Sequence, residues 1–505
     1  MTDFAATHGE VAHTSTSETS ADVKARSLSL AGAFLVAASA AAWTVAVGWL
    51  AVWRHNQFLS HRFDLGNMVQ AVWSTAEGRP LELTDGHTGE QIVRLGAHVD
   101  PALVVFVPLW WIHSGPESLI LGQAAALAAG LYPVVRLTLK HTGSGFAAAL
   151  LGGSYLAFPW ILWNAINDVH PVTLAIPVLL FAIWFLDQHH LGRFALCAAL
   201  AMTGGELIGL TVAALGLWYA FKYRRWLVGL GIATGGTAWA AICLLLVIPA
   251  FNEGRPSRFY SLFESVGGSP QGLVVTLFTD PETVLAQVAT GADGLYVLLL
   301  LVPTAFLALG QPLLLATALP QLGVNALSGV SATTQPMYQY VSAITPVLVA
   351  ASIMSVGRFH GRLRLVAAAL PLAAALMCLA WKPPFPGEDA FLFPQPDSTA
   401  RTEAMRDAIE LVPSSASVTA TNRLGAHLSA RRKIYLFPER ARADWAVIDT
   451  RDSYSYGAYE FGSWLLREHR VDQRPAESPL VKLEHDPAWR LVFDSAGVRV
   501  YRRTS

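Results

Sequence analysis

The chain has 505 residues, of which 53% are hydrophobic and only 14% are charged, against roughly 25% charged residues in ordinary soluble domains. Its mean hydropathy is +0.41, and its apolar residues form long blocks, so the composition excludes an ordinary soluble domain and predicts a polytopic α-helical membrane protein. The formal net charge of −1 provides no basic field for nucleic acid, which we therefore do not expect as a partner.

The first residues are polar and lack an apolar core, which predicts a disordered cytoplasmic tail over 1–27. The apolar block from Leu28 to Trp53 is too long for a signal-peptide core and lacks a convincing cleavage site, so we predict a retained first span. The three cysteines lie singly inside apolar blocks, which indicates packing residues rather than a metal site or a disulfide framework: Cys197, Cys243 and Cys378.

Runs of about 20 apolar residues can cross the hydrocarbon core of a bilayer. Eleven such spans are predicted within a transmembrane domain over 28–381: 28–53, 117–136, 145–164, 171–187, 190–204, 206–222, 226–250, 294–309, 311–327, 339–358 and 362–381. The stretch 191–222 is too long for one crossing, and Gly204-Gly205-Glu206 interrupts it, so we predict two short antiparallel spans with Glu206 at a turn. One long helix would place this carboxyl near the bilayer centre, at a cost of roughly 2.5–3.5 kcal/mol.

The orientation follows from the Lys and Arg residues of the short loops, which favour the cytoplasmic side. One set of loops carries them: Lys24, Arg26, Arg136, Lys140, Arg193, Lys222, Arg224, Arg225, Arg358, Arg362 and Arg364. The alternate loops around 165–170, 203–206 and 328–338 contain neither residue. We therefore predict a multi-pass protein of the cytoplasmic membrane with its N-terminus inside and its C-terminal domain outside. The short apolar run 101–113 is then an interfacial helix that does not cross.

Three regions are predicted outside the membrane: loops over 54–116 and 251–293 and a small α/β domain over 382–505. The domain follows a proline-rich linker that begins at Lys382. Its predicted elements are helices at Thr399–Leu411 and Tyr459–Glu468 and strands at Ser415–Ala420, Lys433–Phe437, Trp445–Thr450 and in a hairpin over 489–503. No glycine-rich phosphate loop follows a strand, so no nucleotide is assigned.

This topology brings the unusual polar residues of the membrane domain to one outer face. The candidates are Asp64, His98, Asp100, Asn164, Asn167, Asp168, His170, Glu206, Glu253, Arg255, Arg258, Gln335, Tyr338 and Gln339. A carboxylate there can act as a general base on an attacking hydroxyl. His and Arg can hold the phosphate of a lipid-linked donor, and acidic groups can hold a divalent cation that shares it. The metal-ligand candidates are Asp64, Asp168 and His170.

Structural roles also fit several of these residues. Asp64 can cap the helix that begins at Leu65, His98 and His170 can be interfacial histidines, and Asp168 can belong to a turn. Arg255 and Arg258 suit solvated loop charges. Glu206 is the hardest to explain structurally, because it is a lone acid in a long apolar block.

Four motifs of the chain resemble a family of bacterial membrane proteins of unknown function (domain of unknown function 2079). They are Phe63-Asp64-Leu65-Gly66, Gly96-Ala97-His98-Val99-Asp100-Pro101, Asn167-Asp168-Val169-His170-Pro171 with Glu206, and Arg423-Leu424-Gly425-Ala426-His427 with Tyr435-Leu436-Phe437-Pro438. The family is grouped with the GT-C glycosyltransferases, which use polyprenyl-phosphate sugars and carry an acidic residue in the first outer loop. The resemblance places Asp64 at that position and Asp168 at a frequent second acidic site. The chain has Gly205 and Leu207 where relatives have Lys and Asp, and Ala97 where an acid is common.

The resemblance implies a transferase that moves a sugar from a polyprenyl-phosphate donor to a cell-envelope acceptor. Asp64 would be the general base, and Asp168 and Glu206 would complete the catalytic set. The predicted substrate-binding residues are His98, His170, Asn167, Arg255, Arg258, Gln335 and Tyr338. Two other functions stay open: a transporter or flippase for a lipid-linked or small polar substrate, and a non-catalytic assembly protein of the envelope.

Overall fold

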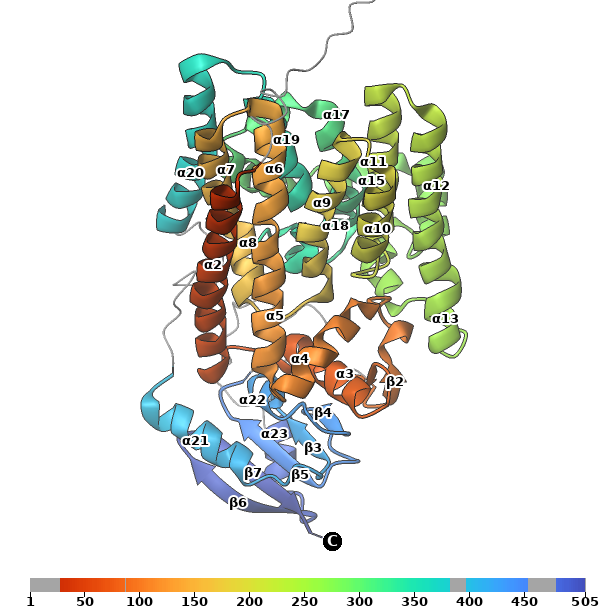
Figure 1. Cartoon of the computed structure of the whole chain (residues 1–505). Helices are drawn as coiled ribbons and strands as arrows, with labels where there is room; N and C mark the ends of the chain where they lie inside the picture. Colours follow the sequence, from red (N-terminus) through yellow and green to blue (C-terminus); the bar gives the residue numbers. More distant parts are fainter. Residues whose placement is uncertain (1–27, 87, 382–396, 453–477, 505) are drawn as a thin grey trace, which may run out of the picture.

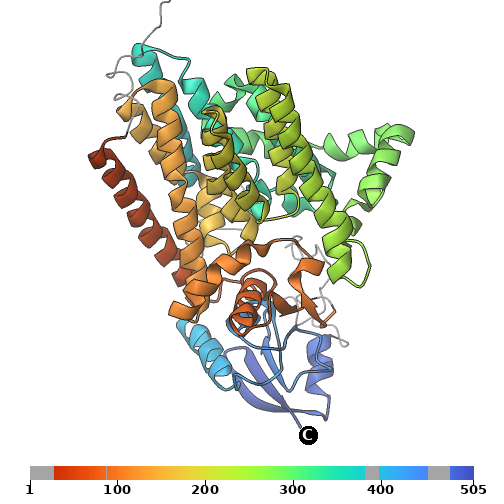
Figure 2. The same cartoon turned by 45° about the vertical axis from the view of Figure 1, so that its right-hand side comes forward.

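The computed structural model describes residues 28–86, 88–381, 397–452 and 478–504. The predicted N-terminal tail, the linker after Lys382 and the helix at Tyr459–Glu468 lie outside these residues. The described chain forms three layers: a helix bundle, the first loop beneath it, and a C-terminal domain with a β-sheet that we call the tail domain (Figures 1 and 2). The end of the bundle that faces the first loop and the tail domain is called here the loop end.

Four helical stretches are long and apolar enough to cross a membrane. They are α2 (Leu30–Asn56), α5 with α6 (Pro116–Ala129 and Leu131–Thr142), α12 with η5 and α13 (Trp226–Ile242, Cys243–Val247 and Ile248–Phe251), and α20 (Gly361–Trp381). Two helix pairs reach the same length but are bent, by 43° between α7 (Gly145–Leu156) and α8 (Pro159–Ile166) and by 51° between α15 (Pro281–Val288) and the following α16 (Gly291–Leu301). The protein is therefore a multi-pass membrane protein.

Shorter apolar helices complete the bundle. They are η4 with α9 (Pro171–Leu174 and Ala175–Asp187), α10 (Leu191–Met202), α11 (Ile208–Tyr223), α17 to α18 (Pro312–Leu315, η9 Ala316–Ala318 and Leu319–Leu327) and α19 (Thr345–Val356). The short elements η7 (Val302–Thr304), η8 (Leu307–Gly310), η10 (Ser331–Thr334) and η11 (Gln339–Val341) connect them. Helices thus occur at each of the eleven predicted spans, but several are too short by length alone to count as full crossings.

The stretch 191–222 is broken as predicted, because α10 ends at Met202, α11 begins at Ile208, and Glu206 lies between them. The run 101–113 forms the short elements η3 (Pro101–Phe106) and α4 (Val107–Ile112). The second predicted outer loop, 251–293, is more structured than expected. It contains η6 (Arg258–Val266), α14 (Pro270–Thr279) and α15, and α15 belongs to one of the two bent span-like pairs.

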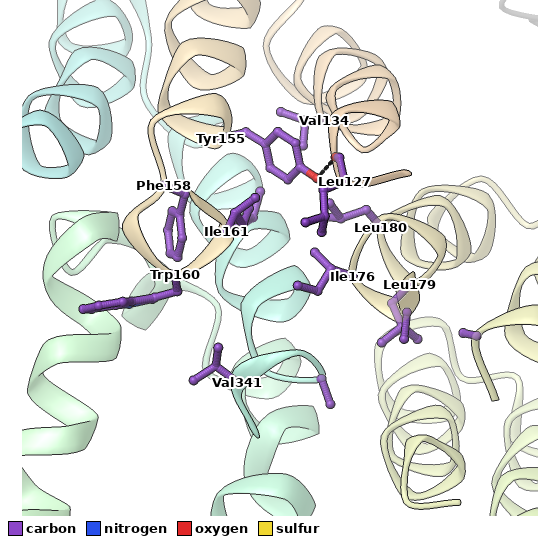
Figure 3. Close-up of a cluster of buried hydrophobic side chains, with 14 of the residues drawn as sticks. Leu127, Val134, Tyr155, Phe158, Trp160, Ile161, Ile176, Leu179, Leu180 and Val341 are labelled. Carbon is purple, nitrogen blue, oxygen red and sulfur yellow. Dashed lines mark hydrogen bonds between the residues drawn. The ribbon is translucent and has the colours of Figure 1, made fainter. Parts of the chain in front are cut away.

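Large side chains and glycines pack the bundle in different places. Trp160, Ile161 and Ile176 are buried in a cluster where the Tyr155 hydroxyl donates to the Leu127 carbonyl at 2.6 Å (Figure 3). Helices α11 and α12 instead approach backbone to backbone. A Cβ atom on Gly216 would lie 2.6 Å from the carbonyl oxygen of Gly229, so only glycine permits this contact between two membrane helices.

At the end of the bundle opposite the loop end, Asp187 ties three helices together. Its carboxylate lies 2.7 Å from the Lys140 ammonium of α6 and 3.0 Å from the Lys222 ammonium of α11. It also accepts from the Tyr223 hydroxyl and contacts His141 at 2.8 Å. The Asp187 carboxylate is thus engaged in packing α6, α9 and α11 together.

The first loop and the tail domain follow as compact layers. The first loop contains η1 (Arg62–Gly66), α3 (Asn67–Ala76), η2 (Arg94–Gly96) and the antiparallel strands β1 (Glu82–Thr84) and β2 (Gln91–Val93). The tail has a five-stranded sheet in the order β4-β3-β5-β7-β6. These strands are β3 (Val418–Ala420), β4 (Ile434–Leu436), β5 (Trp445–Asp449), β6 (Trp489–Ser495) and β7 (Val498–Arg503), with helices α21 (Thr399–Glu410), α22 (Asn422–His427) and α23 (Pro479–Glu484). Each predicted tail strand is present, and β3 is parallel to both β4 and β5.

The tail domain packs against the end of α2 through a stack of aromatic rings. The His427 ring of α22 lies 4.0 Å from the His55 ring and 4.2 Å from the Phe58 ring, centroid to centroid. Its Nε2 is buried without a hydrogen-bond partner among the described residues. Burial, together with the nearby charge of His55, lowers the pKa of His427 well below its ordinary value of 6.5.

This depressed pKa predicts that tail docking depends on pH. Below pH 6.5 an undocked His427 binds a proton that the docked His427 does not, so docking is fully stable above this pH and weakens as the pH falls below it, by at most about 1.4 kcal/mol per pH unit. Hydrogen exchange of the β3 and β5 amides at pH 5.5 and 7.5 measures the effect. His427→Gln should reduce the difference between the two pH values, and an equal difference in both proteins would contradict the assignment.

Candidate functional site

Asp64 lies on an irregular turn at the loop end of the bundle. The chain leaves α2, extends through His61 and then forms the π-helical turn η1, which runs directly into α3. The Asn67 side chain donates to the Phe63 carbonyl at 2.6 Å and closes this turn. The Asp64 side chain remains 36% exposed, which leaves it accessible to a substrate.

Asp168 lies on a second turn, which one buried glutamine holds. Asp168 has a positive φ of 58°, a conformation that Asp tolerates better than most residues. Gln123 of α5 donates to the carbonyls of Asn164 and Asp168, both at 2.9 Å, and accepts from the His170 amide at 2.9 Å. Gln123 therefore fixes the backbone on both sides of Asp168.

The two turns meet and bring four titratable side chains together, here called the Asp64 cluster: His61, Asp64, Asp168 and His170. The distance from His61 Nδ1 to Asp168 Oδ2 is 3.0 Å, and the His61 amide also donates to Asp168 Oδ1 at 3.3 Å. His170 Nε2 lies 3.2 Å from Asp64 Oδ1. The structure thus brings the predicted residues Asp64, Asp168 and His170 close together.

Electrostatics in the cluster favour charged forms. Burial opposes ionisation of Asp64, but the His170 hydrogen bond and the charges of His170, His61 and Arg94 hold the pKa of Asp64 below its ordinary value. Burial likewise opposes protonation of His61, but the hydrogen bond and charge of Asp168 raise the pKa of His61. Asp64 is therefore ionised at neutral pH.

Three members of the cluster have the chemistry and spacing of a cation site. One ligand atom each of His61, Asp64 and Asp168 lies within 4.8 Å of the others. Imidazole and carboxylate ligands about 2.0–2.2 Å from a metal lie at most about 4.4 Å apart. Side-chain shifts of a few tenths of an ångström would therefore bring the three ligand atoms to metal-binding distance. This group contains His61 rather than the predicted candidate His170, whose Nε2 lies 3.2 Å from Asp64 Oδ1. Such a contact is typical of the outer-shell partners of metal ligands.

This arrangement predicts that a divalent cation binds at the Asp64 cluster. His61→Ala and Asp168→Asn should each weaken Mn²⁺ binding by at least about tenfold, because outer-shell changes alone cost 10–100-fold. Titration followed by electron paramagnetic resonance measures the affinity. The exposed Glu77 of the same loop provides the control Glu77→Gln, and equal affinities in all four proteins would refute the site.

A second polar group surrounds Glu206 and is called here the Glu206 cluster: Arg94, His98, Asp100 and Glu206. Glu206 Oε1 lies 3.2 Å from His98 Nδ1, and Oε2 accepts from the Val99 amide at 3.1 Å. Burial would raise the pKa of Glu206, but the contacts with His98 and the Val99 amide keep it below its ordinary value. Arg94 forms a two-pronged ion pair with Asp100 at 2.6–2.9 Å.

The charge of Arg94 also acts on Asp64. His98 and Val99, which hold Glu206 on the connection between α10 and α11, belong to the same first loop that carries Asp64. The ring of Phe259, from η6, stacks on His98 with 4.3 Å between centroids. Residues from the first loop, the α8–η4 turn, the α10–α11 turn and the second loop thus gather at the loop end of the bundle.

The other predicted site residues have different surroundings. Arg258 forms an ion pair with Asp85, and its neighbour Phe259 covers His98. Arg255 pairs with Glu253 on the surface, with both side chains more than 70% exposed. Asn167 caps α8 through its amide, which donates to the Trp163 carbonyl at 2.9 Å.

Gln335 and Tyr338 lie on the connection between η10 and η11, where the Tyr338 amide donates to the Gln335 carbonyl at 3.2 Å. Tyr340, which follows this connection in η11, interacts electrostatically with Asp64. Sequence reasoning missed Tyr340, His61 and Gln123. The spacing of His61 and Asp64, three residues apart, was a usable signal, whereas Gln123 lies in an apolar helix and gave none.

Comparison with known proteins gives one family and a distant structural likeness. The model of the family described as predicted membrane protein (DUF2079) matches residues 54–466. The crystal structure of ArnT from Cupriavidus metallidurans bound to undecaprenyl phosphate is similar at 11% identity and a TM-score of 0.49, over 92% of this chain and 97% of that one. The structure of the same protein in the apo state gives 11% identity and a TM-score of 0.39, over 92% and 98% of the two chains. None of the curated proteins matches. The match over most of the chain shows that this protein belongs to the DUF2079 family of predicted membrane proteins.

Proposed function

We propose that this protein is an inverting glycosyltransferase of the GT-C type. It transfers a sugar from a polyprenyl-phosphate carrier to an acceptor of the cell envelope, at the outer side of the cytoplasmic membrane. The observation that supports this proposal best is the Asp64 cluster, in which an ionised, partly exposed carboxylate lies beside a second acid and two histidines at the ends of membrane helices.

In this mechanism Asp64 accepts the proton of the acceptor hydroxyl while the hydroxyl oxygen attacks the anomeric carbon of the sugar. The bond from that carbon to the phosphate oxygen breaks, and polyprenyl phosphate leaves with the electron pair. His170 orients Asp64 through their 3.2 Å contact. A divalent cation held by His61, Asp64 and Asp168 would offset the charge of the phosphate. Glu206, ionised and held by His98, can orient a sugar or acceptor hydroxyl.

The transport alternative predicts paired ionisable residues at mid-depth, and Glu206 is its one candidate in the sequence. Glu206 lies on the connection between α10 and α11, bonded to the first loop. The assembly alternative would gain if Asp64, Asp168 and Glu206 lay far apart. Asp64 and Asp168, however, belong with His61 to one group whose ligand atoms lie within 4.8 Å of one another. Both observations favour a catalytic site over the two alternatives.

The test is transfer by the purified protein in proteoliposomes. A panel of radiolabelled polyprenyl-phosphate sugars is offered with envelope lipids and glycans as acceptors and with Mn²⁺ or Mg²⁺. The proposal expects one donor to lose its label to an acceptor with inversion of the anomeric configuration. Movement of labelled lipid across the bilayer without any transfer would support the transport alternative and overturn the proposal.

A further inference from the structure

We infer that the tail domain is a positioning part of the site, because it holds the turn that carries Asp64 from both sides. The effect on catalysis that we infer rests on the proposed function. The site is then complete only while the tail is docked on the first loop.

The first contact lies within the turn itself. The amide of Phe63, the residue before Asp64, donates to Asn422 Oδ1 of the tail at 3.1 Å. The packing around this bond leaves no space for a side chain at two glycines. A Cβ atom on Gly66 would lie 2.5 Å from Ser429 Oγ, and one on Gly425 would lie 2.8 Å from the Cβ of Arg62. Gly66 of η1 and Gly425 of α22 therefore each lie too close to the opposite segment to carry a side chain without a shift.

Arg62 supplies the second contact, from the interior of the interface. Its side chain is only 1% exposed, and one guanidinium nitrogen donates to Gln70 Oε1 at 2.9 Å, to the Thr84 carbonyl at 3.1 Å and to the Ile434 carbonyl of β4 at 3.3 Å. Burial lowers the pKa of Arg62 to about 9, although the charge of Asp85 opposes this shift. Arg62 thus joins the first loop to the edge strand of the tail sheet.

The third contact lies on the other side of His61. Phe58 is 1% exposed and belongs to the hydrophobic core of the tail domain, with Leu424 and Val447. The Arg423 side chain of α22 donates to the Phe58 carbonyl at 2.5 Å. The tail therefore binds the backbone at Phe58 and at Phe63, and the segment between them contains His61 and leads into Asp64.

These contacts affect catalysis by fixing the position of Asp64, and the tail residues that make them need not touch the substrate. A displacement of about 1 Å of a catalytic group can cost about 100-fold in rate. Loss of the Asn422 bond should therefore lower kcat for transfer and leave the KM for the donor nearly unchanged.

The experiment uses full-length protein with three tail variants. Asn422→Ala removes the acceptor of the Phe63 amide, Asn422→Asp retains an acceptor oxygen of the same shape, and Arg499→Ala removes a tail charge that pairs with Glu484 and Asp494 away from the first loop. The readouts are kcat and donor KM for transfer, and hydrogen exchange of the amides at 61–67. Protection of the β5 amides reports whether the tail remains folded.

We expect Asn422→Ala to lower kcat by about 10–100-fold, with donor KM within about twofold, and to speed exchange at Phe63 by about tenfold. Asn422→Asp should restore both values, and Arg499→Ala should match the parent protein. Unchanged exchange at 61–67, or unchanged kcat, in Asn422→Ala would overturn the inference. If Asn422→Ala loses protection of the β5 amides, a second variant, Gly66→Ala, tests the inference instead. Its added methyl group contacts Ser429 from the side of the first loop. The readouts are again kcat and exchange at 61–67.

The two proposals fail in different ways. A parent protein that transfers no sugar refutes the proposed function, and the exchange at 61–67 then decides alone whether the tail holds the turn. Transfer that is insensitive to Asn422→Ala, with a folded tail, refutes the positioning role and leaves the proposed function standing.

Discussion

Asp64→Asn should lower sugar transfer by about 10³-fold without unfolding the protein, since a positioned general base contributes about 10²–10⁴-fold. The amide has nearly the shape of the carboxylate, so it can keep a hydrogen bond with His170, which lies 3.2 Å from Asp64 Oδ1. It cannot accept the proton of the acceptor hydroxyl, and it is a weaker cation ligand. Initial rates in proteoliposomes at saturating donor, with and without added Mn²⁺, measure the loss.

The matched control is Glu77→Gln, which changes an exposed acid at the end of α3 in the same loop. It should transfer sugar at the parental rate. Full activity of Asp64→Asn, with protein of normal thermal stability, would remove Asp64 from the mechanism.

Phe58→Ala should destabilise the docked tail domain by about 3–5 kcal/mol, the range for truncation of a buried phenylalanine. Phe58 is 1% exposed and lies in the tail core although it belongs to the first loop by sequence. Its removal leaves a cavity between α2 and α22 that the rigid backbone contacts nearby cannot close. Denaturant dependence of β3 and β5 amide exchange in detergent-solubilised protein measures the change.

Phe278→Ala is the matched truncation at a phenylalanine that is 83% exposed. It should alter the same transition by less than about 0.5 kcal/mol. Equal stability of Phe58→Ala and the parent protein would contradict the assignment of Phe58 to the tail core.

The parts of the fold that the sequence predicted are those set by local patterns. The acid Glu206 in an apolar block identified the break between α10 and α11, and the turn Asp494-Ser495-Ala496-Gly497 identified the hairpin of β6 and β7. The second loop, 251–293, was predicted only as a region outside the membrane. Helix α15 is long enough to cross a membrane only when it is combined with α16, across a bend of 51°. A short stretch of sequence does not show that two helices combine in this way.

In the candidate site, too, some residues could be predicted from local sequence patterns and others could not. Asp64, Asp168 and His170 could be brought together because the alternation of spans sets which turns share a face. Gln123, Arg62 and Tyr340 could not, since each acts through tertiary contacts: Gln123 with the 164–170 turn, Arg62 with β4, and Tyr340 with Asp64. Arg255 was predicted from charge alone, and its partner Glu253, two residues away, keeps it on the surface.

Hydrogen exchange of the full-length protein in nanodiscs, with and without polyprenyl phosphate and Mn²⁺, would test most directly whether these separate segments form one lipid-phosphate site. We expect that adding both slows exchange in three segments at once, 61–67, 97–100 and 167–170, with little change at the Asp187 end of the bundle. Slower exchange only at the Asp187 end, or unchanged exchange in all three segments, would contradict a single lipid-phosphate site.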